Sequence, residues 1–389
     1  MRRHAAQAIL AVPVALAATL VPVAPPRAAP SPSGEERVRG DQWHLRYLKV
    51  ADAHRTSQGA GVTVAVPDTG VDPHPDLVRN LLPGTDVIPG GNGDGRQDRD
   101  SHGTSMAGLI AAYGQGDGDG ALGIAPKAKI LPIYGIPTSD QGESAGLAAG
   151  IEWAIGHGTS VISISGVTGN TPQLDRAVDA ALKADVVVVA GVGNRPASVM
   201  VGYPARREGV IAVAGVDRNG EHASISVTGP EVDVAAPAVD IYSTSNDGKY
   251  SKGTGTSGAT AIVAGAAALI RSKYPNLSAS EVAHRLTATA IDKGPPGQDD
   301  QYGYGVIDLV AALTADVPPL EPAPVTASAP AITTTPATTA VAEPASNGNG
   351  DDGATARGLA TLGVIVAAGG GYLLWRRRRR TDDPPKISR

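Results

Sequence analysis

Apolar and polar positions between residues 41 and 314 follow two patterns that alternate along the chain. Short, continuously apolar runs are typical of strands buried on both faces, and the segments between them have helical patterns. The predicted strands are Val62–Val66, Ile130–Ile133, Val161–Ser165, Val186–Ala190 and Val210–Val216. The predicted helices are His102–Ala112, Ser144–Gly156, Leu174–Ala184, Ser257–Tyr274 and Ser278–Thr289. This alternation predicts an α/β fold, a three-layer sandwich in which helices flank a mainly parallel sheet.

The first residues have the pattern of an export signal. Arg2 and Arg3 precede an apolar run from Ala5 to about Leu20, and proline and alanine residues follow. An uncleaved anchor is the alternative interpretation, although the run is short and Pro13 interrupts it. We therefore expect a signal peptide at residues 1–29 and a short N-terminal extension at residues 30–42.

The C-terminal part has the pattern of a membrane anchor. Residues 358–375 contain no charged side chain, which is near the short limit of the roughly 17–25 residues that a transmembrane helix needs. Five arginines, Arg376–Arg380, follow directly and predict a basic cytoplasmic tail at residues 376–389. A segment lying on the membrane surface is the alternative. Residues 315–357 are rich in proline, alanine and threonine and predict an extended linker. The expected topology is type I and single-pass in the cell membrane, with the folded part extracytoplasmic.

Composition excludes several classes of site. The net charge is −5 and no basic stripe crosses the folded part, so nucleic-acid binding has no support. The chain has no cysteine, which excludes disulfides and thiolate metal sites. Because phenylalanine is also absent, the core must be packed from small and branched side chains.

Three glycine-flanked motifs carry the candidate chemistry. Asp68 follows the apolar run VTVAV, His102 begins the segment HGTSMAG, and Ser257 lies in GTGTSGAT. Each residue alone has an ordinary explanation, namely a turn, a surface or capping histidine, and an N-cap serine. Together they offer a hydroxyl, a base that can take its proton, and a carboxylate that can orient that base.

These motifs resemble the D-T-G, H-G-T-x-x-A-G and G-T-S-x-A signatures of the subtilase (subtilisin-like serine protease) family over about residues 43–313. The resemblance implies a subtilisin-like peptidase domain at residues 43–314 that hydrolyses peptide bonds through an acyl-enzyme. It implies Ser257 as nucleophile, His102 as general base and then acid, and Asp68 as the group that stabilises the imidazolium. The family's large residue, proline and histidine after the serine are replaced by Gly258, Ala261 and Ile262, which predicts slower turnover.

Two further segments resemble family elements. The run ADVVVVAGVGN ends at Asn194, whose amide matches the family's oxyanion-hole donor, and the alternative is a polar loop after a strand. Ser163, Ser165 and Gly166 resemble the edge strand along which family substrates lie extended, which uses main-chain pairing.

The loop Asn92–Asp100 contains carboxylates and glycines, as calcium loops do, but it lacks the EF-hand spacing. A solvated acidic loop is the preferred interpretation, and no metal or other cofactor is predicted.

The short extension, linker, single span and basic tail resemble the mycosins, membrane-anchored subtilases associated with type VII secretion. The absence of cysteine departs from that group. The resemblance implies a polypeptide substrate and secretion-machinery partners. The alternative is a weakly active subtilase fold that acts mainly as a structural partner of a secretion complex. A wall-binding module would need exposed aromatic clusters, and only 3% of the residues are aromatic.

Overall fold

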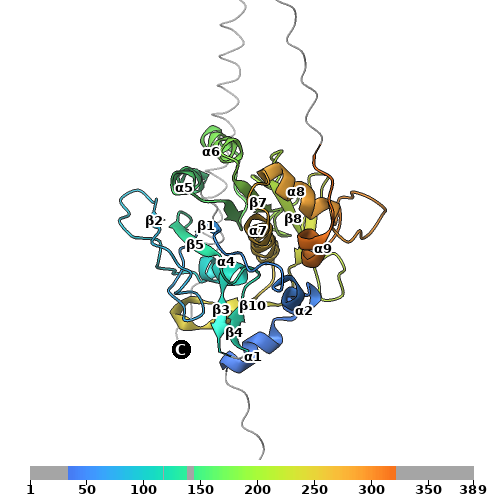
Figure 1. The fold of residues 1–389 in the computed structure, drawn as a ribbon. Helices are drawn as coiled ribbons and strands as arrows, with labels where there is room; N and C mark the ends of the chain where they lie inside the picture. The colour runs from blue at the N-terminus through green and yellow to red at the C-terminus, as the bar shows by residue number, and fades with distance from the viewer. Residues whose placement is uncertain (1–33, 117, 138–143, 321–389) are drawn as a thin grey trace, which may run out of the picture. The chain divides into compact units, whose positions relative to one another are not determined.

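A seven-stranded parallel sheet forms the centre of the molecule, in the order β2-β5-β1-β6-β7-β8-β9 (Figure 1). The computed structural model describes residues 34–116, 118–137 and 144–320. The strands of this sheet are β1 (Thr63–Asp68), β2 (Thr85–Asp86), β5 (Lys129–Tyr134), β6 (Val161–Ile164), β7 (Val187–Gly191), β8 (Ile211–Val216) and β9 (Val234–Pro237). Five of them overlap the strands predicted from apolar runs, whereas β2 and β9, at the two edges, were not predicted.

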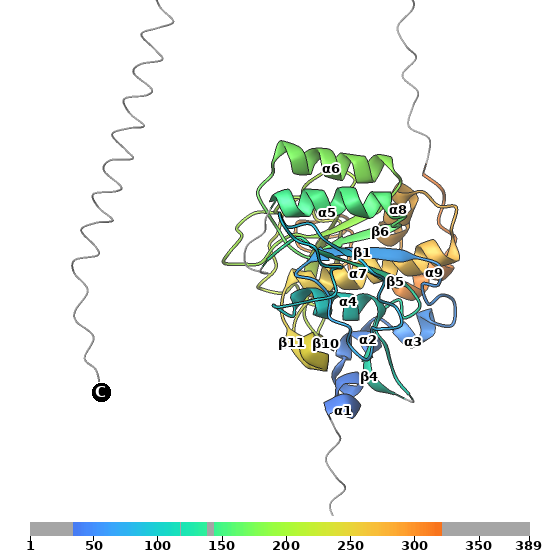
Figure 2. The ribbon, with the colours of Figure 1, turned by 90° about the vertical axis from the view of Figure 1, so that its left-hand side faces the viewer.

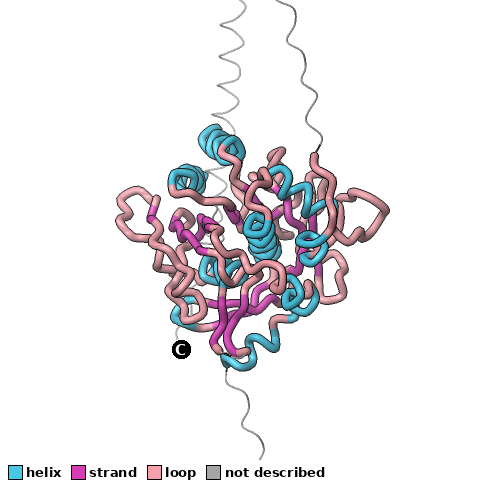
Figure 3. The backbone as a smooth tube through the Cα atoms, viewed as in Figure 1, coloured by secondary structure: helices cyan, strands magenta, loops and turns pink. Residues whose placement is uncertain are grey.

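Helices cover both faces of the sheet (Figure 3). In Figure 2, α5 (Ser144–Gly156) and α6 (Pro172–Lys183) lie on one side of β1 and β6, and α4 (His102–Ala111) and α7 (Thr256–Lys273) lie on the other. The helix α8 (Ala279–Ala288) begins with a capping box in which Ser278 and Glu281 satisfy each other's backbone N–H groups. The helix α9 (Leu309–Thr314) follows near the end of the described chain. The predicted three-layer α/β fold is therefore confirmed.

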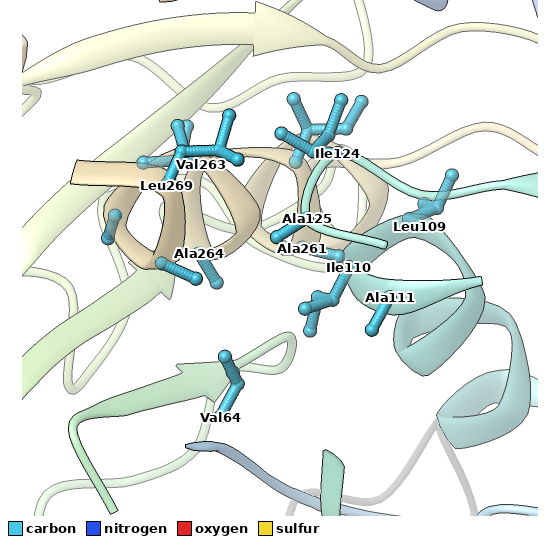
Figure 4. Packing of buried hydrophobic residues seen from close by; sticks show 14 of the residues in the cluster. Val64, Leu109, Ile110, Ala111, Ile124, Ala125, Ala261, Val263, Ala264 and Leu269 are labelled. Atoms are coloured by element: carbon cyan, nitrogen blue, oxygen red, sulfur yellow. The ribbon is translucent and has the colours of Figure 1, made fainter. Parts of the chain in front are cut away.

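The helix α7 runs through the core and is built almost entirely from small side chains. Every residue from Gly258 to Ile270 is buried. Gly265 allows the helix to approach Ile124, because a Cβ at this glycine would lie 2.7 Å from the Ile124 Cβ. Figure 4 shows this packing, in which side chains of α7 meet Ile124 and residues of α4. Small residues thus let α4, α7 and the sheet pack closely without any phenylalanine.

Residues 34–62, the described part of the chain before β1, form three short helices, α1 (Gly34–Asp41), α2 (Trp43–Tyr47) and α3 (Val50–Ala53). Between α1 and α2, the fully buried Gln42 joins two hairpins. Its amide donates to the carbonyls of Leu122 at 3.1 Å and Tyr242 at 3.2 Å, and its Oε1 accepts from the Leu122 N–H at 2.9 Å. The hairpins are β3 (Tyr113–Gln115) with β4 (Asp119–Leu122), and β10 (Ile241–Thr244) with β11 (Tyr250–Gly253), and the 3-10 turn η1 (Asn246–Gly248) connects the second pair. Part of the segment assigned to an N-terminal extension is therefore a docked helix.

The membrane and export predictions concern residues outside the described part of the chain. These are the signal peptide at 1–29, the linker from residue 321 onward, the span at 358–375 and the tail at 376–389. Within residues 34–116, 118–137 and 144–320, no helix has the length and hydropathy needed to cross a bilayer.

Candidate active site

Three elements bring the candidate triad residues to one end of the sheet. Asp68 is the last residue of β1, His102 is the first residue of α4, and Ser257 is the second residue of α7. His102 and Ser257 line the same cavity. This arrangement follows the general rule that ligand sites of parallel sheets lie beyond the carboxyl ends of the strands.

Asp68 and His102 form a short hydrogen bond. The distance from His102 Nδ1 to Asp68 Oδ1 is 2.7 Å, and Asp68 is only 2% exposed. The same carboxylate oxygen accepts from the Thr69 N–H at 2.8 Å. Because a carboxylate can only accept, Nδ1 carries a proton in this pairing and Nε2 is left as the basic nitrogen.

The electrostatic surroundings favour the charged form of this histidine. Burial alone would lower the pKa of His102, but the carboxylates of Asp68, Asp100 and Asp98 outweigh it and raise the pKa above the ordinary 6.5. The His102 side chain remains 21% exposed, so it can reach a substrate in the cavity.

The Ser257 hydroxyl donates to the backbone carbonyl of Ser165 at 2.8 Å, and the Ser165 hydroxyl donates to the carbonyl of Ser257 at 3.3 Å. The sequence predicts His102 as the group that accepts the Ser257 proton. The nucleophile hydroxyl must therefore turn away from Ser165 before it can donate to His102.

Asn194 lies three residues beyond β7 and faces the first turn of α7. Its Oδ1 accepts from the Thr256 N–H at 2.8 Å and from the Thr256 hydroxyl at 3.2 Å. With the oxygen held in this way, the amide Nδ2 is the group left to donate. Asn194 and Ser257 line one cavity, and the first N–H groups of a helix have no intrahelical acceptor. The site therefore combines a side-chain donor with the positive end of a helix.

Of the three residues predicted to bind the substrate backbone, one lies within β6 and two lie beyond its end. β6 is an interior strand between β1 and β7, so Ser163 does not lie on an edge strand of the sheet. Ser163 is fully buried and its register partner in β7 is Val189. Ser165 and Gly166 follow the last residue of β6, beyond the paired part of the strand. Their role in substrate binding stays a prediction.

Sequence reasoning missed the role of Asp98. The preferred interpretation of its loop was a solvated acidic segment, but this carboxylate is only 6% exposed. Its Oδ1 accepts from the Thr69 hydroxyl at 2.8 Å, the Asp100 N–H at 3.0 Å and the Ser101 N–H at 2.9 Å. Its Oδ2 accepts from the N–H of Thr104 at 2.8 Å and from its hydroxyl at 2.6 Å. Asp98 thus joins the residue after Asp68 to the first turn of the helix that carries His102.

In the described part of the chain, no group of three or more His, Asp or Glu side chains is placed to hold a metal ion. The calcium alternative for Asn92–Asp100 stays an untested prediction.

Comparisons with known proteins identify the family to which the chain belongs. The profile of the subtilase family (Peptidase_S8) matches residues 59–305. Subtilisin DY of Bacillus licheniformis is 41% identical over 261 residues, which is 66% of this chain and 92% of that protein. A thermostable alkaline protease of Halalkalibacterium halodurans is 38% identical over 267 residues, covering 68% of this chain and 71% of that protein.

Several solved protein structures are also similar to this chain. The crystal structure of MycP1 from Mycobacterium smegmatis has a TM-score of 0.63 and 30% identity, covering 71% of this chain and 85% of that one. The structure of the MycP3 protease from the type VII (ESX-3) secretion system has a TM-score of 0.61 and 35% identity, covering 70% of this chain and 88% of that one.

Proposed function

Because this chain belongs to the subtilase family of serine endopeptidases, we propose that it cleaves polypeptides through an acyl-enzyme formed on Ser257. The observation that carries the proposal is the 2.7 Å bond between Asp68 and His102 at a cavity that Ser257 and Asn194 also line. This arrangement provides a nucleophile, an oriented base and a donor for negative charge within one site.

The proposed reaction begins when the Ser257 hydroxyl leaves the Ser165 carbonyl and attacks the peptide carbonyl carbon. His102 Nε2 takes the hydroxyl proton, and Asp68 stabilises the imidazolium through Nδ1. The carbonyl oxygen becomes an oxyanion that the Asn194 amide and the N–H groups at the start of α7 stabilise.

His102 then gives its proton to the leaving amine, the C–N bond breaks, and the acyl group remains on Ser257. Water attacks this ester, with His102 again as the base, and the acid product leaves. Removing the Asn194 amide should cost on the order of 10²–10³ in rate, the magnitude known for this donor in subtilisin.

The proposal also places the enzyme at the outer face of the cell membrane in association with type VII secretion. Its support is the likeness to MycP1, described as an essential component of the type VII (ESX-1) secretion system, and to MycP3. Residues 358–375 would supply the anchor. The proposed substrate is therefore a polypeptide that the secretion machinery brings to the same membrane.

A second candidate function is a structural partner of the secretion complex with weak proteolysis. Two observations favour it: the Ser257 hydroxyl is held by Ser165, and the residues at 258, 261 and 262 depart from the family pattern. A catalytic site can be retained on a protein whose main task is assembly.

A fluorophosphonate probe tests the first proposal. The wild-type chain should be labelled on Ser257, and Ser257→Ala should not be labelled. Ser224→Ala is the matched control, because Ser224 is exposed and its loss should leave labelling unchanged. Absence of labelling in the wild type would refute the acyl-enzyme. If Ser257→Ala cells secrete normally, the structural role is favoured over the proteolytic one.

A further inference from the structure

The cavity at the active site has a volume of about 470 Å³. Part of its wall is apolar, and this part is called the apolar hollow. Met106 and Leu109 of α4 line it on one side, and Ala238 and Ile241, around the start of β10, line it on another. Polar side chains surround these apolar residues at Asp100, Ser101, Ser105, Ser245, Ser251 and Thr254.

Gly258 makes this hollow accessible from Ser257. A Cβ built at Gly258 would lie 3.6 Å from Leu109 Cδ1 and 3.9 Å from Ile241 Cγ1, which is ordinary van der Waals contact. The backbone there is helical, so no positive φ requires glycine. Glycine inside a helix is less favourable than alanine. Gly258 therefore contributes to the cavity through its lack of a side chain. Gly253 on β11 also lacks a side chain and lines the same cavity.

The position of the hollow identifies which part of a substrate would enter it. Ser165 contacts Ser257 but does not line the cavity. Ser105, Met106 and Leu109 do line it, and they belong to the same helix as His102. Because His102 gives its proton to the leaving amine, the residue after the cut bond lies beside His102 and α4.

From this geometry we infer that the cavity beside Gly258 binds a bulky apolar side chain on the residue that follows the cleaved bond. The inference rests on the proposed function. Transfer of a leucine-sized side chain from water to an apolar pocket favours it over alanine by about 10-fold or more in kcat/KM. An acidic side chain is disfavoured there, because the hollow offers apolar contacts and the carboxylate-bearing Asp100 lines the same cavity.

The test uses the reverse of peptide cleavage, which does not require knowledge of the natural substrate. A small acyl ester acylates Ser257 in the purified full-length chain, and amino acid amides then compete with water for the acyl-enzyme. The amine attacks the ester carbonyl, His102 takes its proton, and Ser257 leaves as the peptide bond forms. The ratio of aminolysis to hydrolysis reports binding on the leaving-group side alone.

Leucinamide and phenylalaninamide should react about 10-fold more efficiently than alaninamide, and aspartic acid amide should react least. Gly258→Met should remove most of this preference by filling the hollow, and Gly258→Ala should reduce it partly. Gly156→Met is the matched control, because an added Cβ there meets no atom within 4 Å and the residue is remote from the cavity.

Equal partitioning of leucinamide and alaninamide in the wild type would overturn the inference, and so would an unchanged preference in Gly258→Met. These results would leave the acyl-enzyme intact, since hydrolysis of the ester would still occur. A chain that is never acylated by the ester would instead refute the proposed function, and the inference would fail with it.

Discussion

Replacing Asp98 by asparagine would test whether this buried carboxylate holds the active-site loops together. The best orientation of the new amide keeps its oxygen where Oδ1 of the aspartate accepts three hydrogen bonds. The NH₂ group then faces the Thr104 N–H, so two donors meet. Thr104 is fully buried, so solvent does not replace the lost acceptor.

The expected loss in the free energy of unfolding follows from these hydrogen bonds. A buried donor left without an acceptor costs about 1–3 kcal/mol, and hydrogen bonds to a charged group are worth about 1.5–3 kcal/mol each. In Asp98→Asn the Thr104 N–H loses its acceptor, and the three hydrogen bonds to Oδ1 are no longer made to a charged group. We expect the free energy of unfolding to fall by about 2–3 kcal/mol. The kcat should fall too, because Asp98 connects the Asp68 turn to the helix of His102.

Urea unfolding of the full-length chain measures the stability change. Asp94→Asn is the matched control in the same loop, because its side chain is 56% exposed and its loss should change stability by less than about 0.5 kcal/mol. If Asp98→Asn and Asp94→Asn had equal stabilities and equal kcat, Asp98 would not have the structural role assigned to it.

Three further predictions concern other groups. The acidic limb of the kcat/KM profile should lie above pH 6.5, because neighbouring carboxylates raise the pKa of His102 and only its neutral form accepts the serine proton. Asp100→Asn should move that limb to lower pH, and an unmoved limb would contradict the contribution of Asp100 to the raised pKa of His102. Burial lowers the pKa of His44 to about 3, so below pH 6.5 the unfolded chain takes up a proton that the folded chain does not. This difference should remove about 2 kcal/mol of stability between pH 7.5 and pH 5, and chemical unfolding of His44→Leu should lack that part of the pH dependence. Gly265→Ala places a Cβ 2.7 Å from the Ile124 Cβ, so its melting temperature should fall with a loss of about 1–3 kcal/mol, and an unchanged value would show that α7 can shift.

The central strands and helices were predictable because burial imposes a strong local pattern. β7 and β8 are continuously apolar, β1 is apolar from Val64 to Pro67, and α5 has the bounds that its sequence pattern predicts. The edge strand β9 was missed because VAAP is short, rich in alanine and ends in proline, all of which weaken a strand signal. The local sequence pattern also does not specify the order of the strands in the sheet. An apolar run such as VISI does not reveal that two other strands flank it.

The residues of the candidate site were likewise only partly predictable from the sequence. Motifs located Asp68, His102 and Ser257, because each lies where a strand or helix meets a loop. The burial of Asp98 depends on a partner 29 residues earlier in the chain, and nothing in the acidic loop itself indicates that contact. The direction of the Ser257 hydroxyl depends on a single side-chain torsion, which residue identity does not specify.

Gln42 has a consequence for the order in which the molecule can assemble. It is synthesised early, yet its acceptors on Leu122 and Tyr242 follow 80 and 200 residues later. Until Tyr242 emerges, the Gln42 NH₂ group has only one of its two acceptors, and the N-terminal helices lack one of their contacts. Contacts of such long sequence separation slow folding, so docking of the N-terminal helices on the β10–β11 hairpin should be a late step. The hairpin also borders the nucleophile's cavity, and proteolytic competence would then appear only when that closure is complete.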